Sequence, residues 1–287
     1  MAAVSVHREH DLLSFARRVM PFLMLREAQH NVMLGLFAVL QARPPEDRPI
    51  LVWAGRDGEV LGAAMRTPPR WTLLAHGSEP EVIEALAAAL AAEDPQMPGV
   101  LSASADAAAF AASWARLTGR TGEIGHHERL YRLDAVIPPQ AVAGRLREVT
   151  EADRELVTDW WQAFANEAIE PTTREQAAQA VHLRYGVDPM VAGCRLWEVD
   201  GVPVSLAGYT GPTPNGIRVG PVYTPPEYRG RGYASAAVAA VSQMLLDWGF
   251  AFVTLFTDLA NPTSNRIYQA IGYQPVCDVD EIRFVPK

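Results

Sequence analysis

Two glycines between arginines, followed directly by an alanine-rich stretch, form the part of this sequence that most clearly suggests chemistry. The segment Arg229-Gly230-Arg231-Gly232 follows an apolar run, 217–222, that predicts a strand, and it precedes a predicted helix over 234–248. A glycine-rich turn that opens a helix directs several free backbone N–H groups at one point, where the helix dipole adds partial positive charge. Because glycine has no Cβ, the backbone can also approach a ligand closely. The segment therefore predicts an anion site suited to a phosphate or a diphosphate.

The residues around these glycines exclude two common phosphate sites. A P-loop requires Gly-Lys followed by Ser or Thr, and no such ending follows Gly232. A dinucleotide fingerprint requires a third small residue in the right place and an acid about twenty residues later. Ala234 and Ser235 follow the second glycine, and no acid ends a predicted strand at that distance. Both alternatives fit poorly.

A second group of residues follows a predicted buried strand over 250–256. Asn261 and Pro262 form a good helix start, because Asn caps a helix and Pro fits its first turn. Gly272 is typical of a helix end. Since Asn261 and Tyr268 are separated by about two helical turns, we expect them on one face of this helix.

Together, the two motifs resemble those of the GCN5-related N-acetyltransferases, the GNAT family, which bind acetyl-CoA. Arg229-x-x-Gly232-x-Ala234 is similar to the family's diphosphate loop, and Asn261, Tyr268 and Gly272-Tyr273 match the pattern after its fifth strand. The resemblance implies acetyl transfer from acetyl-CoA by direct attack of an amine in a ternary complex. It also implies cofactor contacts at Val222, Tyr223, Thr224, Arg229, Gly230, Arg231, Gly232, Tyr233, Ala234, Asn261 and Tyr268.

The resemblance assigns catalytic roles to Tyr268 and Asn261. Tyr268 stands at the family's general-acid position, where it would protonate the leaving thiolate, and Asn261 would contact the pantetheine arm. The backbone of 222–224 would pair with that arm as with an added strand. The base that deprotonates the amine stays open, because the motif strand lacks the glutamate that some relatives carry there. The candidates are Glu167, Glu170, Asp258, His182 and a water chain.

The acceptor is expected beside the first helices of the second half of the chain. Aromatic and acidic residues recur there at helical spacing, at Trp160, Trp161, Phe164 and Glu167. Such a cluster suits an amine with an apolar body, although aromatic residues at this spacing also form ordinary cores. We expect a small-molecule primary amine as acceptor. The alternatives are a lysine or N-terminus of a protein, or a non-catalytic acyl-CoA-binding module.

The predicted elements divide the chain into two halves with the same plan. Each half has helices, a hairpin with an Asp-Gly turn (57–58 and 200–201), and then a strand and a helix. We predict an α/β fold with two tandem acetyltransferase-like domains, each an α+β mixed sheet flanked by helices. The expected division is a degenerate domain over 1–134, which lacks both motifs, a linker over 135–145, and an acetyl-CoA-binding domain over 146–287.

Composition restricts the remaining classes of function. The chain has 287 residues, of which 49% are hydrophobic and 20% charged, as in globular proteins. Its net charge of -8 argues against general nucleic-acid binding. Cys194 and Cys277 have no metal-ligand spacing, so we expect reduced thiols, no metal and a cytoplasmic protein. No signal-peptide core or membrane span is recognised, and we expect a monomer or homodimer without nucleic-acid or membrane partners.

Overall fold

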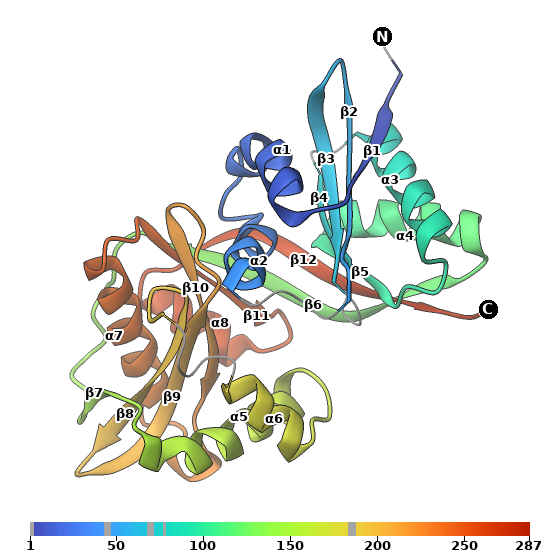
Figure 1. Ribbon diagram of the computed structural model, residues 1–287. Helices are drawn as coiled ribbons and strands as arrows, with labels where there is room; N and C mark the ends of the chain where they lie inside the picture. The colour runs from blue at the N-terminus through green and yellow to red at the C-terminus, as the bar shows by residue number, and fades with distance from the viewer. Residues whose placement is uncertain (1–2, 43–46, 68–71, 77–78, 183–187) are drawn as a thin grey trace. The chain divides into compact units, whose positions relative to one another are not determined.

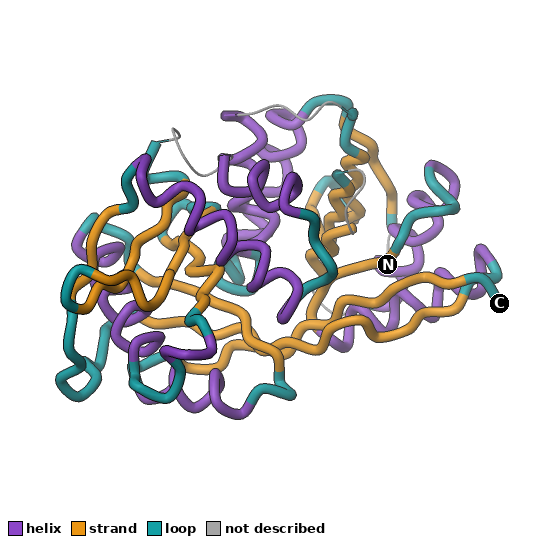
Figure 2. Tube along the Cα trace, turned by 90° about the horizontal axis from the view of Figure 1, so that it is seen from below, coloured by secondary structure: helices purple, strands orange, loops and turns teal. Residues whose placement is uncertain are grey.

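The computed structural model describes residues 3–42, 47–67, 72–76, 79–182 and 188–287. The chain divides into two compact units. The N-terminal unit contains 1–130, 257–261 and 276–287, and the C-terminal unit contains 131–256 and 262–275. In both units, helices flank strands (Figure 2). The predicted mixed α/β fold is therefore confirmed.

The first half of the chain forms a hairpin-based sheet with helices on both faces. The Asp57-Gly58 turn has positive φ at both residues, 50° and 82°, as its sequence predicts. The first helix of the chain begins after Asp11, whose carboxylate accepts a hydrogen bond from Ser14 N at 2.8 Å. The elements are β1 (Ser5–Glu9), α1 (Leu12–Met24), α2 (Asn31–Ala42), β2 (Ile50–Arg56), β3 (Glu59–Arg66), β4 (Thr72–His76), α3 (Pro80–Glu93), β5 (Gly99–Ala103), α4 (Ser104–Thr118) and β6 (Thr121–Leu133).

Alternation along β2 directs successive side chains to opposite faces of the N-terminal sheet. Val52 and Ala54 contribute to the core with α3 and α4, whereas Leu51 and Trp53 contribute to the core with α1 and α2. All four are buried. The strand order in this unit is β1-β2-β3-β4-β5-β12-β6, where β12 comes from the end of the chain.

The second half repeats this plan. Thr150 and Asp153 form a capping box before the first helix of this half. The strand order in the C-terminal unit is β11-β10-β9-β8-β7, which matches β5-β4-β3-β2-β1. The elements are β7 (Arg145–Glu148), the 3-10 turn η1 (Glu151–Asp153), α5 (Arg154–Ala168), α6 (Arg174–His182), β8 (Ala192–Val199), β9 (Val202–Thr210), β10 (Gly216–Tyr223), the 3-10 turn η2 (Pro226–Tyr228), α7 (Tyr233–Asp247), β11 (Phe252–Asp258), α8 (Pro262–Ala270) and β12 (Gln274–Val285).

Two cores cover the two faces of the C-terminal sheet. One contains α7, with Tyr268 of α8, against strand residues such as Ile217 and Val253. The other contains α5 and α6 against Leu206 and Tyr223. Figure 1 shows α7 and α5 on opposite sides of β8, β9 and β10. Among the described residues, no helix is long and apolar enough to cross a membrane.

Most of the last strand of the chain belongs to the N-terminal unit. The sequence had instead predicted a first domain over 1–134 and a second domain that continues from 146 to 287. β12 pairs antiparallel with β5, with Val279 opposite Ala103 and Arg283 opposite Gly99. Ile282 and Phe284 complete the core of α3 and α4. Residues 276–287 therefore fold with the first half, although they follow the second half in sequence.

Replacing Phe284 tests this exchange of strands. Its ring lies 5.1 Å from that of Trp114 and is 3% exposed. We expect Phe284→Ala to lower the free energy of unfolding of the N-terminal unit by about 3–5 kcal/mol, because it leaves a cavity. Urea denaturation measures the loss, and hydrogen exchange locates it in β5 and α4. Val276→Ala, at a 40% exposed position of the same strand, is the matched control. Faster exchange confined to α7 would contradict the assignment.

Candidate functional site

β10 and β11 run parallel and then separate. Their register covers only three pairs, from Gly216 opposite Phe252 to Arg218 opposite Thr254. Both strands continue, β10 to Tyr223 and β11 to Asp258, and within 188–287 no further pairing between them is described. The end of β10 therefore has one edge that lacks a neighbouring strand over its last residues.

The other edge of β10 is held by β9. Val222 pairs with Ala207 and Tyr223 with Leu206, after an irregularity in register between Val219 and Val222. The hydroxyls of Thr224 and Ser205 are 2.8 Å apart. The three predicted contact residues, 222–224, thus lie on a fixed strand end whose backbone on the β11 side can accept an extended, amide-bearing ligand.

The loop after β10 has the backbone geometry of an anion site. Gly230 and Gly232 have φ of 77° and 79°, in the left-handed region that favours glycine. α7 begins at Tyr233, and the first hydrogen bond that enters the helix runs from Ala236 N to Gly232 O at 3.0 Å. The N–H groups of the first turn, 233–235, precede that bond and have no intrahelical partner. They converge at the positive end of the helix dipole.

The space at these glycines distinguishes their roles. A Cβ built on Gly230 meets no atom of the described residues within 4 Å, so the loop is open on that side. A Cβ on Gly232 would lie 3.1 Å from a methyl group of Val142. Gly230 therefore faces open space, and Gly232 both ends the loop and packs closely. This geometry fits a diphosphate seated on the helix start.

The two arginines of the loop have different surroundings. Arg229 donates through Nη2 to both carboxylate oxygens of Glu167, at 2.7 and 3.0 Å. Its Nε donates to Thr224 O at 2.8 Å. Arg231 is exposed, and in the part of the chain that is described it forms no ion pair. Both arginines were expected to contact the cofactor. At Arg229, the carboxylate of Glu167 competes with the cofactor for the guanidinium.

Tyr268 lies on α8 with its side chain 9% exposed. Burial raises the pKa of its hydroxyl to about 12, so the phenol stays protonated at neutral pH. The helix that carries it is held by Tyr131, which donates to Asn265 Oδ1 and accepts from Gln269 Nε2, both at 2.9 Å. Tyr268 is therefore a neutral hydrogen-bond donor on a fixed helix.

Asn261 immediately precedes α8, which begins at Pro262 as the sequence predicts. Its N–H donates to Asp258 O at 3.0 Å, and 257–261 belong to the N-terminal unit. Its contact with a cofactor stays a prediction. Among the other candidates for the base, Glu170 lies exposed after α5, and His182 ends α6. Asp258 ends β11 and accepts from Ala260 N at 2.7 Å.

Trp160 and Trp161 are mainly core residues. They are 8% and 9% exposed and pack with Val157 and Tyr223. The rings of Trp160 and Tyr223 lie 6.2 Å apart. Phe164 is half-buried, whereas the carboxylate of Glu167 reaches solvent. Of the two alternatives for this cluster, an ordinary core describes the two tryptophans. Glu167 remains accessible to solvent.

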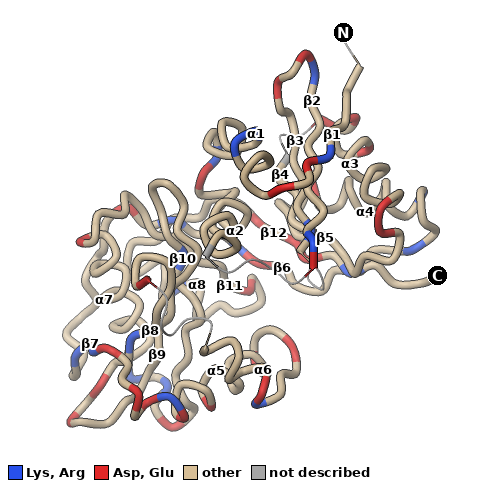
Figure 3. The backbone as a smooth tube through the Cα atoms, in the orientation of Figure 1, with Lys and Arg blue, Asp and Glu red and all other residues tan. Residues whose placement is uncertain are grey.

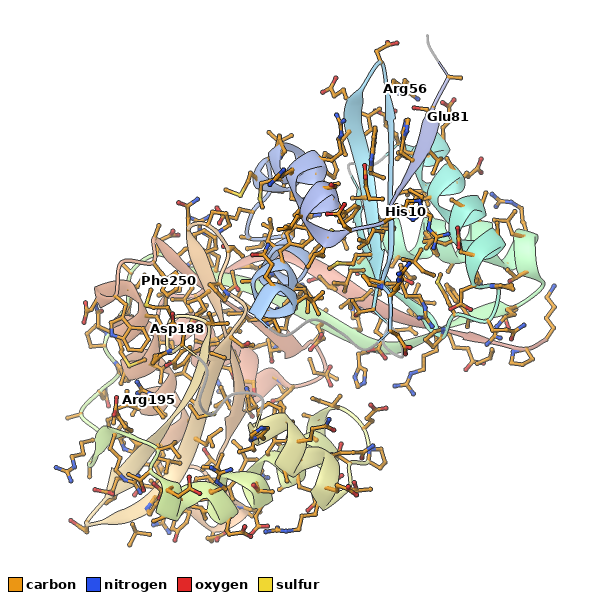
Figure 4. The ribbon with its side chains drawn as sticks, viewed as in Figure 1. His10, Arg56, Glu81, Asp188, Arg195 and Phe250 are labelled. Carbon is orange, nitrogen blue, oxygen red and sulfur yellow. The ribbon has the colours of Figure 1, made fainter. Side chains whose placement is uncertain are left out.

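The equivalent connection in the N-terminal unit, between β4 and α3, contains no arginine, and acids stand at the start of the helix that follows it. Glu79 precedes α3, and Glu81 lies in its first turn. Arg56 donates to Glu81 at 2.8 Å and to Glu79 at 2.5 Å, and Figure 4 shows Arg56 and Glu81 together. Carboxylates already occupy the described start of α3, so this helix start is unsuited to a phosphate. Residues 77–78 lie outside the described residues.

Comparisons with known proteins give a family for one region and a fold for the chain. The profile of the Acetyltransferase (GNAT) family matches residues 154–273. A GCN5-related N-acetyltransferase from Sphaerobacter thermophilus is 16% identical with a TM-score of 0.64, over 98% of this chain and 95% of that one. One from Kribbella flavida is 20% identical with a TM-score of 0.58, over 91% and 96%.

A tandem GNAT protein from the clavulanic acid biosynthesis pathway shares the whole length of the fold. It is 11% identical with a TM-score of 0.59, over 98% of both chains. At these identities the likeness establishes the fold. No curated protein matches the sequence significantly.

Proposed function

Residues 154–273 belong to the acetyltransferase (GNAT) family, and we propose that this chain transfers an acetyl group from acetyl-CoA to a primary amine of a small molecule. One observation carries the proposal. The separated edge of β10 leads directly into a glycine loop at the start of α7, so a strand-like binding edge and an anion site are continuous. A ligand with an amide-bearing arm and a diphosphate matches that sequence of sites.

The chain's own groups have distinct tasks in this reaction. Backbone N–H groups over 230–235 neutralise the diphosphate, with Arg231 beside them, and the open edge of 222–224 aligns the arm. Acetyl-CoA supplies the activated thioester carbonyl. The Tyr268 hydroxyl, kept neutral by burial, would donate a hydrogen bond to the sulfur as the C–S bond breaks and negative charge develops on it.

Thermal unfolding with and without acetyl-CoA tests the proposal first. Ligand at about a hundred times Kd adds about 2.7 kcal/mol to the unit that binds it, so we expect a rise of several degrees in Tm. NAD and ATP are the controls, because each carries phosphates without a pantetheine arm. A larger rise with either control, or none with acetyl-CoA, would reject the assignment. Binding without turnover across a panel of primary amines would reject catalysis and keep the cofactor site.

A further inference from the structure

The two arginines of the glycine loop differ in their surroundings: Arg231 is exposed, whereas Arg229 contacts neighbouring groups. Arg229 is the first residue of the loop, yet its guanidinium returns toward the end of β10 and toward α5. It contacts Glu167 at 2.7 Å and Thr224 O at 2.8 Å, and its Cζ lies 5.8 Å from the centre of the Tyr223 ring. These three contacts occupy the charged end of the side chain on the acceptor side of the loop.

The carboxylate of Glu167 is placed beside an aromatic surface by this contact. The Tyr223 ring is 8% exposed and packs near Trp160. Burial and then the neighbouring charge of Glu167 raise the pKa of Tyr223. The side chain of Glu167 is itself 48% exposed. The rings themselves are buried, so the accessible group at this place is the carboxylate, which is suited to an ammonium group.

Acidic side chains lie along α5, where Figure 3 shows red segments, and Glu155 and Asp159 are already paired with Arg174. Glu167, near the end of the same helix, is paired with Arg229 and is 48% exposed. Because an exposed ion pair adds little to folding stability, a ligand can share or replace the contact between Arg229 and Glu167 at small cost to the fold.

We infer that the two loop arginines serve different substrates: Arg231 binds the cofactor phosphates, and Arg229 is a positioning residue that holds Glu167 for the acceptor ammonium. This inference rests on the proposed function. The acceptor class is a primary alkylamine with an apolar body, and Glu167 pairs with its ammonium on binding. After Glu167 orients the amine and the ammonium loses a proton to solvent, the nitrogen lone pair would attack the thioester carbonyl carbon. The C–N bond would form, the C–S bond would break, and the CoA thiolate would leave.

Calorimetric titration of the full-length protein with acetyl-CoA tests the division of roles. We expect Arg231→Met to weaken acetyl-CoA binding about tenfold, the scale of one charge-assisted hydrogen bond, and to reduce its dependence on salt. Arg229→Met should bind acetyl-CoA within about twofold of wild type. Equal losses in both variants would overturn the inference and leave the proposed function intact. Failure of the wild type to bind acetyl-CoA would instead reject the proposed function.

Titration of the CoA-saturated protein with primary alkylamines that carry aryl or alkyl bodies tests the acceptor side. Glu167→Gln should weaken amine binding about tenfold, and Arg229→Met should weaken it while Arg229→Lys restores part of it. Glu155→Gln removes the same charge from the first turn of the same helix and should change nothing. If Glu167 and Arg229 had only a structural role, their replacement would weaken amine binding and acetyl-CoA binding together. A wild type that binds acetyl-CoA but none of these amines would overturn the acceptor assignment.

Discussion

Gly230→Val should abolish acetyl-CoA binding, with a loss of at least about a hundredfold in affinity. The residue has φ of 77°, so a β-branched side chain strains the loop, and its Cβ points into open space at the start of α7. A side chain there would occupy the place where a phosphate must approach the N–H groups, and loss of two or more charge-assisted hydrogen bonds gives this scale. Isothermal titration calorimetry measures the change.

Gly201→Val separates the effect on binding from the effect on the backbone. Gly201 has φ of 82° in the turn between β8 and β9, and a Cβ there also meets nothing within 4 Å among the described residues. Both variants therefore suffer similar strain, of about 1–2 kcal/mol, but only one lies in the loop. Gly232 is a less suitable site, because a side chain would press on Val142. Retained acetyl-CoA affinity in Gly230→Val would remove the loop from the cofactor site.

The sequence predicted elements that have local signals and missed those that depend on distant partners. The Asp-Gly turns and the helix start at Pro262 each depend on neighbouring residues, and each is confirmed. α2 was missed because its residues are apolar almost throughout, which hides helical periodicity. β12 was missed because its partner β5 lies far back in the chain. An alternating pattern of apolar and polar residues does not reveal that a strand pairs with a distant part of the chain.

The candidate site also has features with a local sequence signal and features that depend on distant partners. The glycine loop could be predicted because positive φ and a following helix are written in adjacent residues, 230–234. The separation of β10 from β11 has no signal in adjacent residues, since it depends on how far the two strands remain paired across an intervening helix, and only the resemblance implied a free edge at 222–224. The contact between Arg229 and Glu167, which joins the loop to α5 across 62 positions, could not be predicted. Ion pairs between distant segments leave no spacing that a single sequence reveals.

Tyr268→Phe should lower kcat about a hundredfold and leave acetyl-CoA affinity nearly unchanged. The substitution keeps the ring that packs in the core with α7, so the fold is retained, but it removes the hydroxyl. General acid catalysis typically contributes at least about that factor. Steady-state kinetics with the best amine of the panel give kcat, and calorimetry gives the acetyl-CoA Kd. Unchanged turnover would remove Tyr268 from the mechanism.

Tyr273→Phe is the matched control, because Tyr273 is also buried and its ring lies 6.0 Å from that of Tyr268. Its hydroxyl is 2.8 Å from that of Ser242, so its loss should lower stability by about 1 kcal/mol and leave kcat unchanged.

The pH profile gives a second check on the role of Tyr268. Since burial raises the pKa of Tyr268 to about 12, its phenol remains the protonated form as pH rises through 9 and 10. Turnover in that range should therefore increase with deprotonation of the amine and show no fall from tyrosine ionisation. A descending limb near pH 10 in wild type that is absent in Tyr268→Phe would mean that the hydroxyl titrates in a more polar environment than its burial indicates.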